Sequence, residues 1–87
     1  MSMGATQTED RAVSYGAPAD QLLQLGLMYS TGEAGPADMV TAHKWFNIAA
    51  MRGSREAVQH RCDIAREMSS ADIAAAQRAA RVWLTRH

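Results

Sequence analysis

The sequence predicts an all-α protein made of two stacked αα-hairpins, which together form a short α-α superhelix. Three observations support this fold class. Apolar residues recur at the i, i+3, i+4 and i+7 spacing of one helix face in alanine-rich segments. Short turns containing Gly, Pro or Ser separate these segments, which favours antiparallel neighbours. The chain has 87 residues, a length that suits one small domain.

The first helix is expected over residues 18–31, after a flexible tail of small and polar residues over 1–16. Proline at position 18 is favoured in a first helical turn, and Gly32 provides a stop. Gly26 lies in mid-helix, where the missing side chain would let another helix approach closely. The predicted buried face consists of Leu22, Leu25, Gly26 and Tyr29, with Leu23 and Leu27 beside it.

The second helix is expected over residues 38–52, after a tight interhelical turn over 32–37. Asp38 is a good N-cap, because its carboxylate can accept a backbone N–H of the first turn. Gly53 ends this helix and closes the first hairpin, residues 17–53. The predicted buried stripe consists of Ala42, Trp45, Phe46 and Ala49, with Met39 and Ala50 at its flanks.

The second hairpin is expected over residues 54–87, with helices over 55–68 and 70–85. Ser54 and Ser69 are the predicted N-caps. Arg61 lies on the apolar side of the third helix, so it should pair with a carboxylate such as Asp63 or Glu67, or extend to solvent. The predicted buried residues are Ala57, Ile64, Ala65 and Met68, followed by Ile73, Ala76, Gln77, Ala80, Trp83 and Leu84.

Charge is balanced over the whole chain but divided unevenly along it. Residues 1–51 carry two bases and five acids, and residues 52–87 carry seven arginines and four acids, which gives −3 and +3. Such polarity can favour head-to-tail contact or steer a partner, and it is also typical of ordinary solvated helix faces.

Catalytic and metal-binding patterns are missing from the sequence. Cys62 is the single cysteine, and His43, His60 and His87 lie on different predicted segments, so three or four converging zinc ligands are not expected. Four serines, Ser30, Ser54, Ser69 and Ser70, fall at predicted helix ends, where capping explains them. We therefore expect no enzyme activity, no cofactor and no metal. Neither an apolar leader nor a run of 18 apolar residues is present, so a cytoplasmic protein without membrane contact is expected.

A combined pattern extends over residues 25–53. It consists of Leu25, Gly26, Tyr29, Gly32, Gly35, Asp38, Ala42, Trp45, Ala49, Ala50 and Gly53. This pattern resembles one Sel1-like repeat, a helix–loop–helix unit similar to the tetratricopeptide repeat. A shift of 36 residues replaces the leading Leu, Gly and Tyr with Arg61, Cys62 and Ala65, so the second hairpin resembles a terminal cap.

The resemblance implies a protein-interaction module that acts as an adaptor, a scaffold or a regulatory subunit. In such repeats the first helix of each pair lines the concave face. The partner would be another protein or peptide, or a second copy of the chain, because one repeat and a cap fall short of a stable solenoid. The implied contact residues are Gln24, Met28, Thr31, His60, Asp63 and Glu67.

The alternative is a small nucleic-acid-binding protein that places Arg78, Arg81 and Arg86 beside phosphates. Two observations disfavour it. The chain is neutral overall, and Trp83 fits the buried stripe better than a base-stacking surface.

Overall fold

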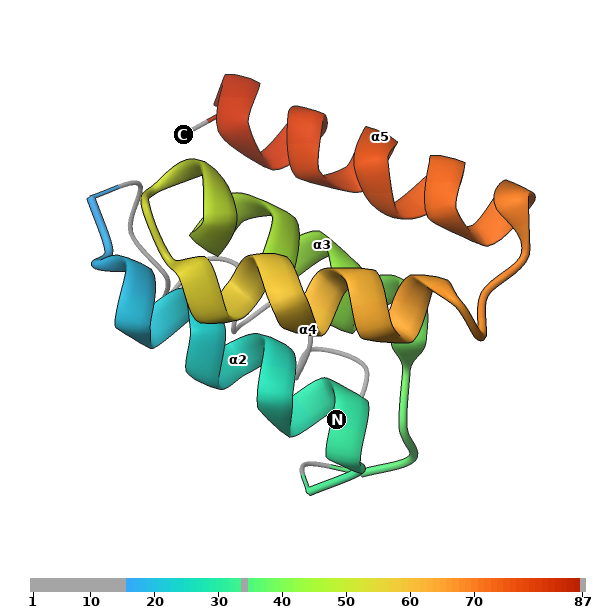
Figure 1. The fold of residues 1–87 in the computed structure, drawn as a ribbon. Coiled ribbons are helices and arrows are strands. Elements are labelled where there is room, and N and C mark those ends of the chain that lie inside the picture. The colour runs from blue at the N-terminus through green and yellow to red at the C-terminus, as the bar shows by residue number, and fades with distance from the viewer. Residues whose placement is uncertain (1–15, 34, 87) are drawn as a thin grey trace, which may run out of the picture.

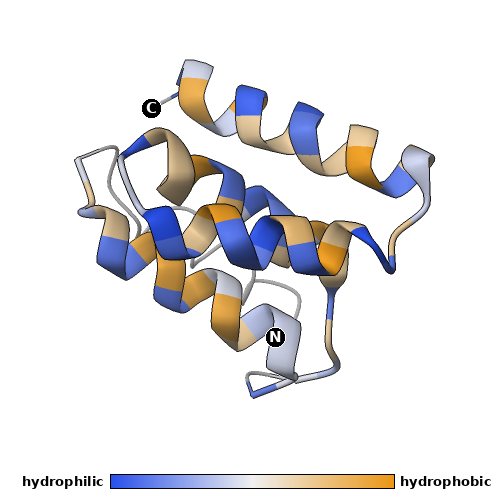
Figure 2. Cartoon of the chain, viewed as in Figure 1, coloured by the Kyte–Doolittle hydropathy of each residue, from blue (hydrophilic) through white to orange (hydrophobic). Residues whose placement is uncertain are grey.

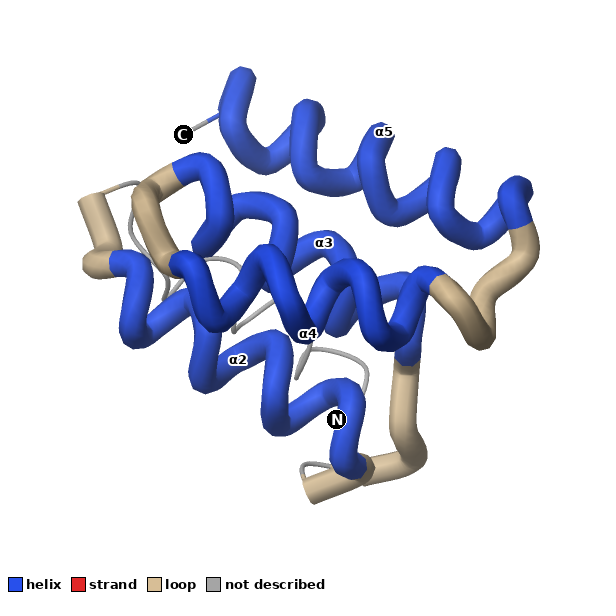
Figure 3. The backbone as a smooth tube through the Cα atoms, viewed as in Figure 1, coloured by secondary structure: helices blue, strands red, loops and turns tan. Residues whose placement is uncertain are grey.

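Residues 16–33 and 35–86 are described by the computed structural model, and within them the chain forms four α-helices and no strand (Figures 1 and 3). The all-α fold class is therefore confirmed. The predicted tail lies outside the described residues except for Gly16, as do Ala34 and His87. The helices are α2 (Ala19–Thr31), α3 (Met39–Met51), α4 (Arg55–Ala65) and α5 (Ser70–Arg86).

The predicted boundaries agree with the structure to within one residue for α2, α3 and α5, but the prediction for α4 was too long. Instead of continuing to residue 68, α4 ends at Ala65. The backbone N–H groups of Glu67 and Met68 donate to the carbonyl oxygens of Ile64 and Ala65, three residues earlier, at 3.0 and 3.2 Å. These bonds form a tight turn that ends the α-helical pattern.

Helix ends are fixed where the sequence predicted caps. The Asp38 carboxylate accepts the Thr41 N–H at 3.1 Å, and the Ser54 hydroxyl accepts the Ala57 N–H at 3.1 Å. Gly32 ends α2 with φ of 78°, a left-handed conformation that favours glycine. Each predicted cap thus satisfies backbone groups that a helix end leaves unpaired.

Helix α3 is the centre of the fold, because it packs against α2, α4 and α5 (Figure 1). Helices α4 and α5 pack on α3 more than on each other. The predicted single stripe on α3 was consequently too narrow, since neighbours on three sides also bury His43, Lys44 and Ile48. A helix surrounded in this way is buried on most of its circumference.

The core joins the two hairpins through aromatic rings and small residues. Trp45 is fully buried and meets Trp83 edge to face, with ring centroids 5.6 Å apart and planes at 77°. Alanines fill the space around them: Ala42, Ala49, Ala57, Ala76 and Ala80 are buried.

Helices α4 and α5 show hydrophilic and apolar bands in alternation, as expected for helices with one buried side (Figure 2). The buried side of α5 includes Ala76, Ala80 and Trp83. Gln77, which was predicted on this side, is exposed. Its position lies about 100° from Ala76 around the helix, which is enough to turn it toward water.

Arg52 connects the start of α2 to α5. One of its guanidinium nitrogens donates to the carbonyl oxygen of Ala17 at 3.1 Å, and its Cζ lies 5.6 Å from the centre of the Trp83 ring. The residue after α3 therefore contacts both the segment before α2 and helix α5.

Candidate interaction face

Three helices meet in a layer made of Gly26, Phe46 and His60. A Cβ at position 26 would overlap the Phe46 ring, so this ring fits only because α2 has glycine there. Phe46 is fully buried, and the His60 imidazole stacks on it with centroids 5.3 Å apart and planes at 19°. The predicted close approach at Gly26 is confirmed, and the layer fixes α2, α3 and α4 relative to one another.

A polar group on the inner side of α4 fixes its position on α3. Arg61 Nη1 donates to Asn47 Oδ1 at 2.8 Å, so of the predicted alternatives Arg61 does pair, but with an amide on α3 and not with the carboxylate of Asp63 or Glu67. The two carboxylates point to solvent, whereas the amide lies on the facing helix. This bond between α3 and α4 depends on their relative register, which the helical pattern does not specify.

His43 lies on α3 and is 3 % exposed, and its Nδ1 has no hydrogen-bond partner among the described residues. Burial, together with the positive charge of Arg61, lowers the pKa of His43 below its usual value. The imidazole is therefore neutral at neutral pH and forms part of the packed interior.

The residues predicted to contact a partner lie along α2 and α4, two helices that touch each other. Gln24 and Thr31 are exposed and Met28 is half-buried on α2, where their spacing places them on one side. The Thr31 hydroxyl donates to the Leu27 carbonyl oxygen at 2.8 Å, which leaves its lone pairs for a partner. Asp63 on α4 and Glu67 in the turn after it are exposed. His60 is half-buried by its stack on Phe46.

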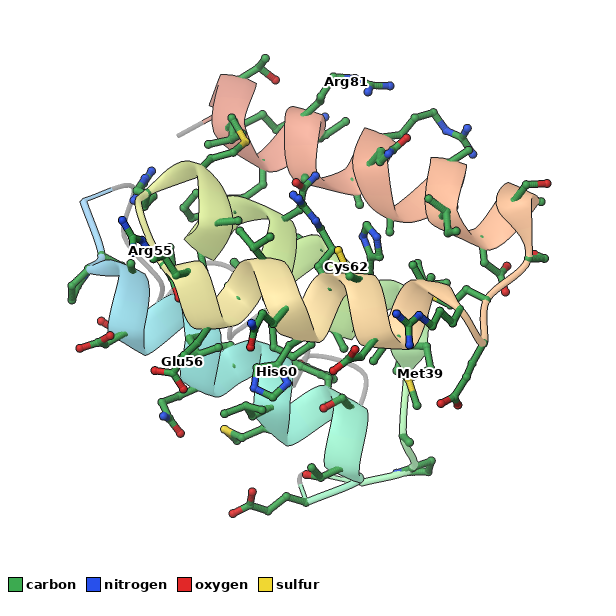
Figure 4. All side chains as sticks on the ribbon, viewed as in Figure 1. Met39, Arg55, Glu56, His60, Cys62 and Arg81 are labelled. Atoms are coloured by element: carbon green, nitrogen blue, oxygen red, sulfur yellow. The ribbon has the colours of Figure 1, made fainter. Side chains whose placement is uncertain are left out.

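Glu56 belongs to the same surface but was missed in the sequence. Positions 56 and 63 lie within about 20° of each other around α4, so their carboxylates form one stripe, which Glu67 extends in the turn after the helix. Figure 4 shows Glu56 and His60 projecting from α4 on the side of α2, whereas Arg55 and Cys62 project on the side of α5. We call the following set the α2–α4 face: Gln24, Met28, Thr31, Glu56, His60, Asp63 and Glu67.

The α2–α4 face is acidic. Glu56, Asp63 and Glu67 are exposed, and within residues 16–33 and 35–86 none of them forms a hydrogen bond or ion pair through its carboxylate. Three carboxylates on one stripe produce a local negative potential, although the chain as a whole is neutral. This surface is suited to a cationic partner.

The motif residues of the first hairpin build the fold behind this face. Ala42, Trp45 and Ala49 are completely buried, and the Asp38 N–H donates to the Tyr29 carbonyl oxygen at 2.9 Å to close the loop between the helices. Leu25, Tyr29 and Ala50 are half-buried at the core margin. The motif glycines at turns have positive φ: Gly32 (78°), Gly35 (139°) and Gly53 (104°).

The arginine-rich region forms a second surface on α5. Arg78, Arg81, Val82 and Thr85 line a shallow, open hollow of about 380 Å³. Arg81 projects from α5 away from the other helices (Figure 4). Trp83 is only 3 % exposed, so it is not available to stack on a nucleic-acid base.

Within the described ranges, no group of three or more His, Cys, Asp or Glu side chains is arranged to hold a metal ion. Cys62 is exposed and projects from α4 on a different side from His60 (Figure 4). None of the helices in these described residues is long and apolar enough to cross a bilayer.

Comparison with known proteins gives no match to a family model, a curated protein or a solved structure. The resemblance to a Sel1-like repeat therefore remains a prediction based on the motif residues.

Proposed function

We propose that residues 17–53 form a Sel1-like repeat with a C-terminal cap, and that the protein binds another protein or peptide through the α2–α4 face. It would act as an adaptor, scaffold or regulatory subunit, without a cofactor and without catalysis. The observation that supports this most directly is the stripe of carboxylates on α4 and the turn after it, which form no hydrogen bond or ion pair within residues 16–33 and 35–86, on a helix that the Gly26–Phe46–His60 layer holds against α2 and α3.

The chemistry of the face defines the class of partner. Lysine or arginine side chains would pair with Glu56, Asp63 and Glu67, and their approach would be steered by the local potential. Met28 and the exposed part of His60 add apolar area beside the carboxylates. The favoured partner is thus a helix or extended segment with two or more cationic residues and some apolar surface.

Photo-cross-linking tests this proposal. A photoreactive residue at Gln24, in the α2–α4 face, should give a discrete adduct in the cells that produce the protein. The matched control places the same residue at Asp72, which is exposed in the first turn of α5 and outside the face. Adducts from both positions, or from neither, would contradict a specific partner at the α2–α4 face.

Nucleic acid is the second candidate partner, favoured by the Arg78 and Arg81 side chains at the hollow on α5. Binding to phosphates should weaken steeply with salt. Fluorescence anisotropy with labelled single-stranded and duplex oligonucleotides at low salt tests it. Unchanged anisotropy would exclude this candidate, whereas binding that the double variant Arg78→Glu/Arg81→Glu abolishes would support it.

A further inference from the structure

The outward side of α5 is unusually apolar for a helix facing water. Helical spacing places seven residues on this side, opposite the buried Ala76, Ala80 and Trp83. Val82 is 49 % exposed. No acidic residue occurs on this side of α5. We call the following set the α5 stripe: Ala71, Ala74, Ala75, Arg78, Arg81, Val82 and Thr85.

The α5 stripe and the α2–α4 face are complementary in charge. Arg78 and Arg81 are three residues apart on α5, a rise of about 4.5 Å. Asp63 lies near the end of α4 and Glu67 in the turn that follows it, and both are exposed. Two arginines on one helix can therefore approach two neighbouring carboxylates of another copy. Among the described residues, neither arginine has a hydrogen bond or ion pair in its own chain.

Like-with-like pairing is disfavoured by the same charges. Two α5 stripes packed together would bring arginines close to arginines, and two α2–α4 faces would bring carboxylates close to carboxylates. Only contact between unlike surfaces pairs opposite charges. A second copy of this chain supplies the cationic, partly apolar helix that the α2–α4 face is suited to bind.

We propose that the α5 stripe of one copy docks on the α2–α4 face of a second copy, in a head-to-tail contact. The inference rests on the proposed function, because it names the partner of the same face. Arg81 projects away from the other helices, while Glu56 and His60 project on the side of α2 (Figure 4), so the two surfaces lie on different sides of the molecule. Each added copy presents a free surface again, and such contacts give rings or open chains.

Sedimentation velocity on the full chain is the first test. The weight-average mass should rise between about 10 μM and about 1 mM, the range of weak interfaces. The association constant should fall at least about tenfold at high salt, because the Debye length shortens from about 10 Å at 0.1 M to about 3 Å at 1 M. A wild-type protein that remains monomeric at low salt throughout this range overturns the inference.

Charge reversal provides the second and sharper test. The variant Arg78→Glu/Arg81→Glu and the variant Glu56→Lys/Asp63→Lys/Glu67→Lys should each be monomeric, because each then carries surfaces of one sign. Mixed in equal amounts, they should associate again, since every unlike contact in the mixture is complementary. Circular dichroism spectra and melts like those of the wild type show that both variants fold.

The matched control reverses two arginines outside the α5 stripe. Arg55 on α4 and Arg66 directly after it are exposed, so the double variant Arg55→Glu/Arg66→Glu changes the net charge as much as Arg78→Glu/Arg81→Glu does. It should associate like the wild type. If it loses association equally, or if the mixed variants stay apart, general charge effects rather than the α5 stripe explain the data and the inference fails.

The cross-linking experiment separates this inference from the proposed function. An adduct from Gln24 with twice the mass of the chain supports both. An adduct with a different protein and no self-association supports the proposed function and overturns the head-to-tail contact.

Discussion

In the first helix pair, α2 packs directly on α3, and the ring of Phe46 fits against the α2 backbone at Gly26. In the second pair, α4 and α5 each pack on α3 more than on each other. The contacts that attach them are specific ones: the Arg61–Asn47 hydrogen bond for α4 and the Trp45–Trp83 edge contact for α5. The two helices of the first pair are consecutive in the chain and pack on each other. The two helices of the second pair are also consecutive, but each packs mainly on α3.

This difference shows that α3, a helix of the first pair, supports both helices of the second pair. Because α3 contacts every other helix, α4 and α5 need little direct contact with each other to be held in the fold. The second pair is consequently free to vary its outer surfaces, and there it carries both the acidic stripe and the α5 stripe. We expect substitutions on α3 to have larger effects than equivalent changes in α4 or α5.

Trp45→Ala should have the largest effect. The side chain is fully buried and contacts Trp83, so its removal should lower the free energy of unfolding by about 3–5 kcal/mol. That loss approaches the whole stability of a small domain. Thermal unfolding followed by far-UV circular dichroism measures it, with Val82→Ala as an exposed control expected within about 0.5 kcal/mol of wild type. A cooperative melt near the wild-type temperature would show that α3 is not the centre of stability.

Gly26→Ala tests the direct packing within the first pair. Alanine favours helix by about 1 kcal/mol, but its Cβ would overlap the Phe46 ring, a kind of overpacking that costs about 1–3 kcal/mol. We expect net destabilisation in urea unfolding. In a Phe46→Leu background the same substitution should become neutral or stabilising. Equal effects in both backgrounds would mean that the close approach does not limit position 26.

Removing one N-cap from each helix pair should have a smaller effect on stability. Asp38 accepts both the backbone N–H of Thr41 at 3.1 Å and its hydroxyl at 2.7 Å, whereas Ser69 accepts the Asp72 N–H at 3.1 Å. Asp38→Ala and Ser69→Ala should each cost about 0.5–2 kcal/mol, and we expect the larger loss at Asp38 because it begins α3. Urea unfolding of both variants measures this order. A larger loss for Ser69→Ala would reverse the ranking of the two helix pairs.

Burial of His43 on α3, together with the charge of Arg61 on α4, should make the free energy of unfolding depend on pH. Above about pH 6.5 the His43 imidazole is neutral in both the folded and the unfolded chain. Below that value the unfolded chain binds a proton at His43 more readily than the folded chain does, because burial and Arg61 lower the pKa of His43 in the folded chain. Stability should therefore fall as the pH decreases, by no more than about 1.4 kcal/mol per pH unit for one proton. His43→Gln should flatten this slope in urea unfolding. An unchanged slope in His43→Gln would assign the effect to other groups.

Local features of the fold could be predicted from the sequence because short-range chemistry specifies them. Asp38 and Ser54 were identified as caps, and Gly32 as a helix stop, from residue type and position alone. The end of α4 could not be predicted, because Glu67 and Met68 are good helix residues whose backbone forms a tight turn before Ser69 caps α5. Tertiary connection overrides local preference there.

The candidate face was only partly accessible from sequence. Glu56 could have been found, because its spacing from Asp63 and Glu67 is a helical one. The stack of His60 on Phe46 and the bond from Arg61 to Asn47 depend on how α4 is positioned along α3, and no periodic pattern within one helix carries that information.

The edge-to-face pair in the core also has an optical consequence. The protein contains two tryptophans, one from each helix pair, with ring centres 5.6 Å apart. Indoles at this distance in a rigid chiral arrangement couple their electronic transitions and should give a strong near-ultraviolet circular dichroism signal. That signal disappears when fixed packing is lost even if helices persist. The docking of α5 on α3 can therefore be followed by spectroscopy on the unlabelled protein, separately from its helix content.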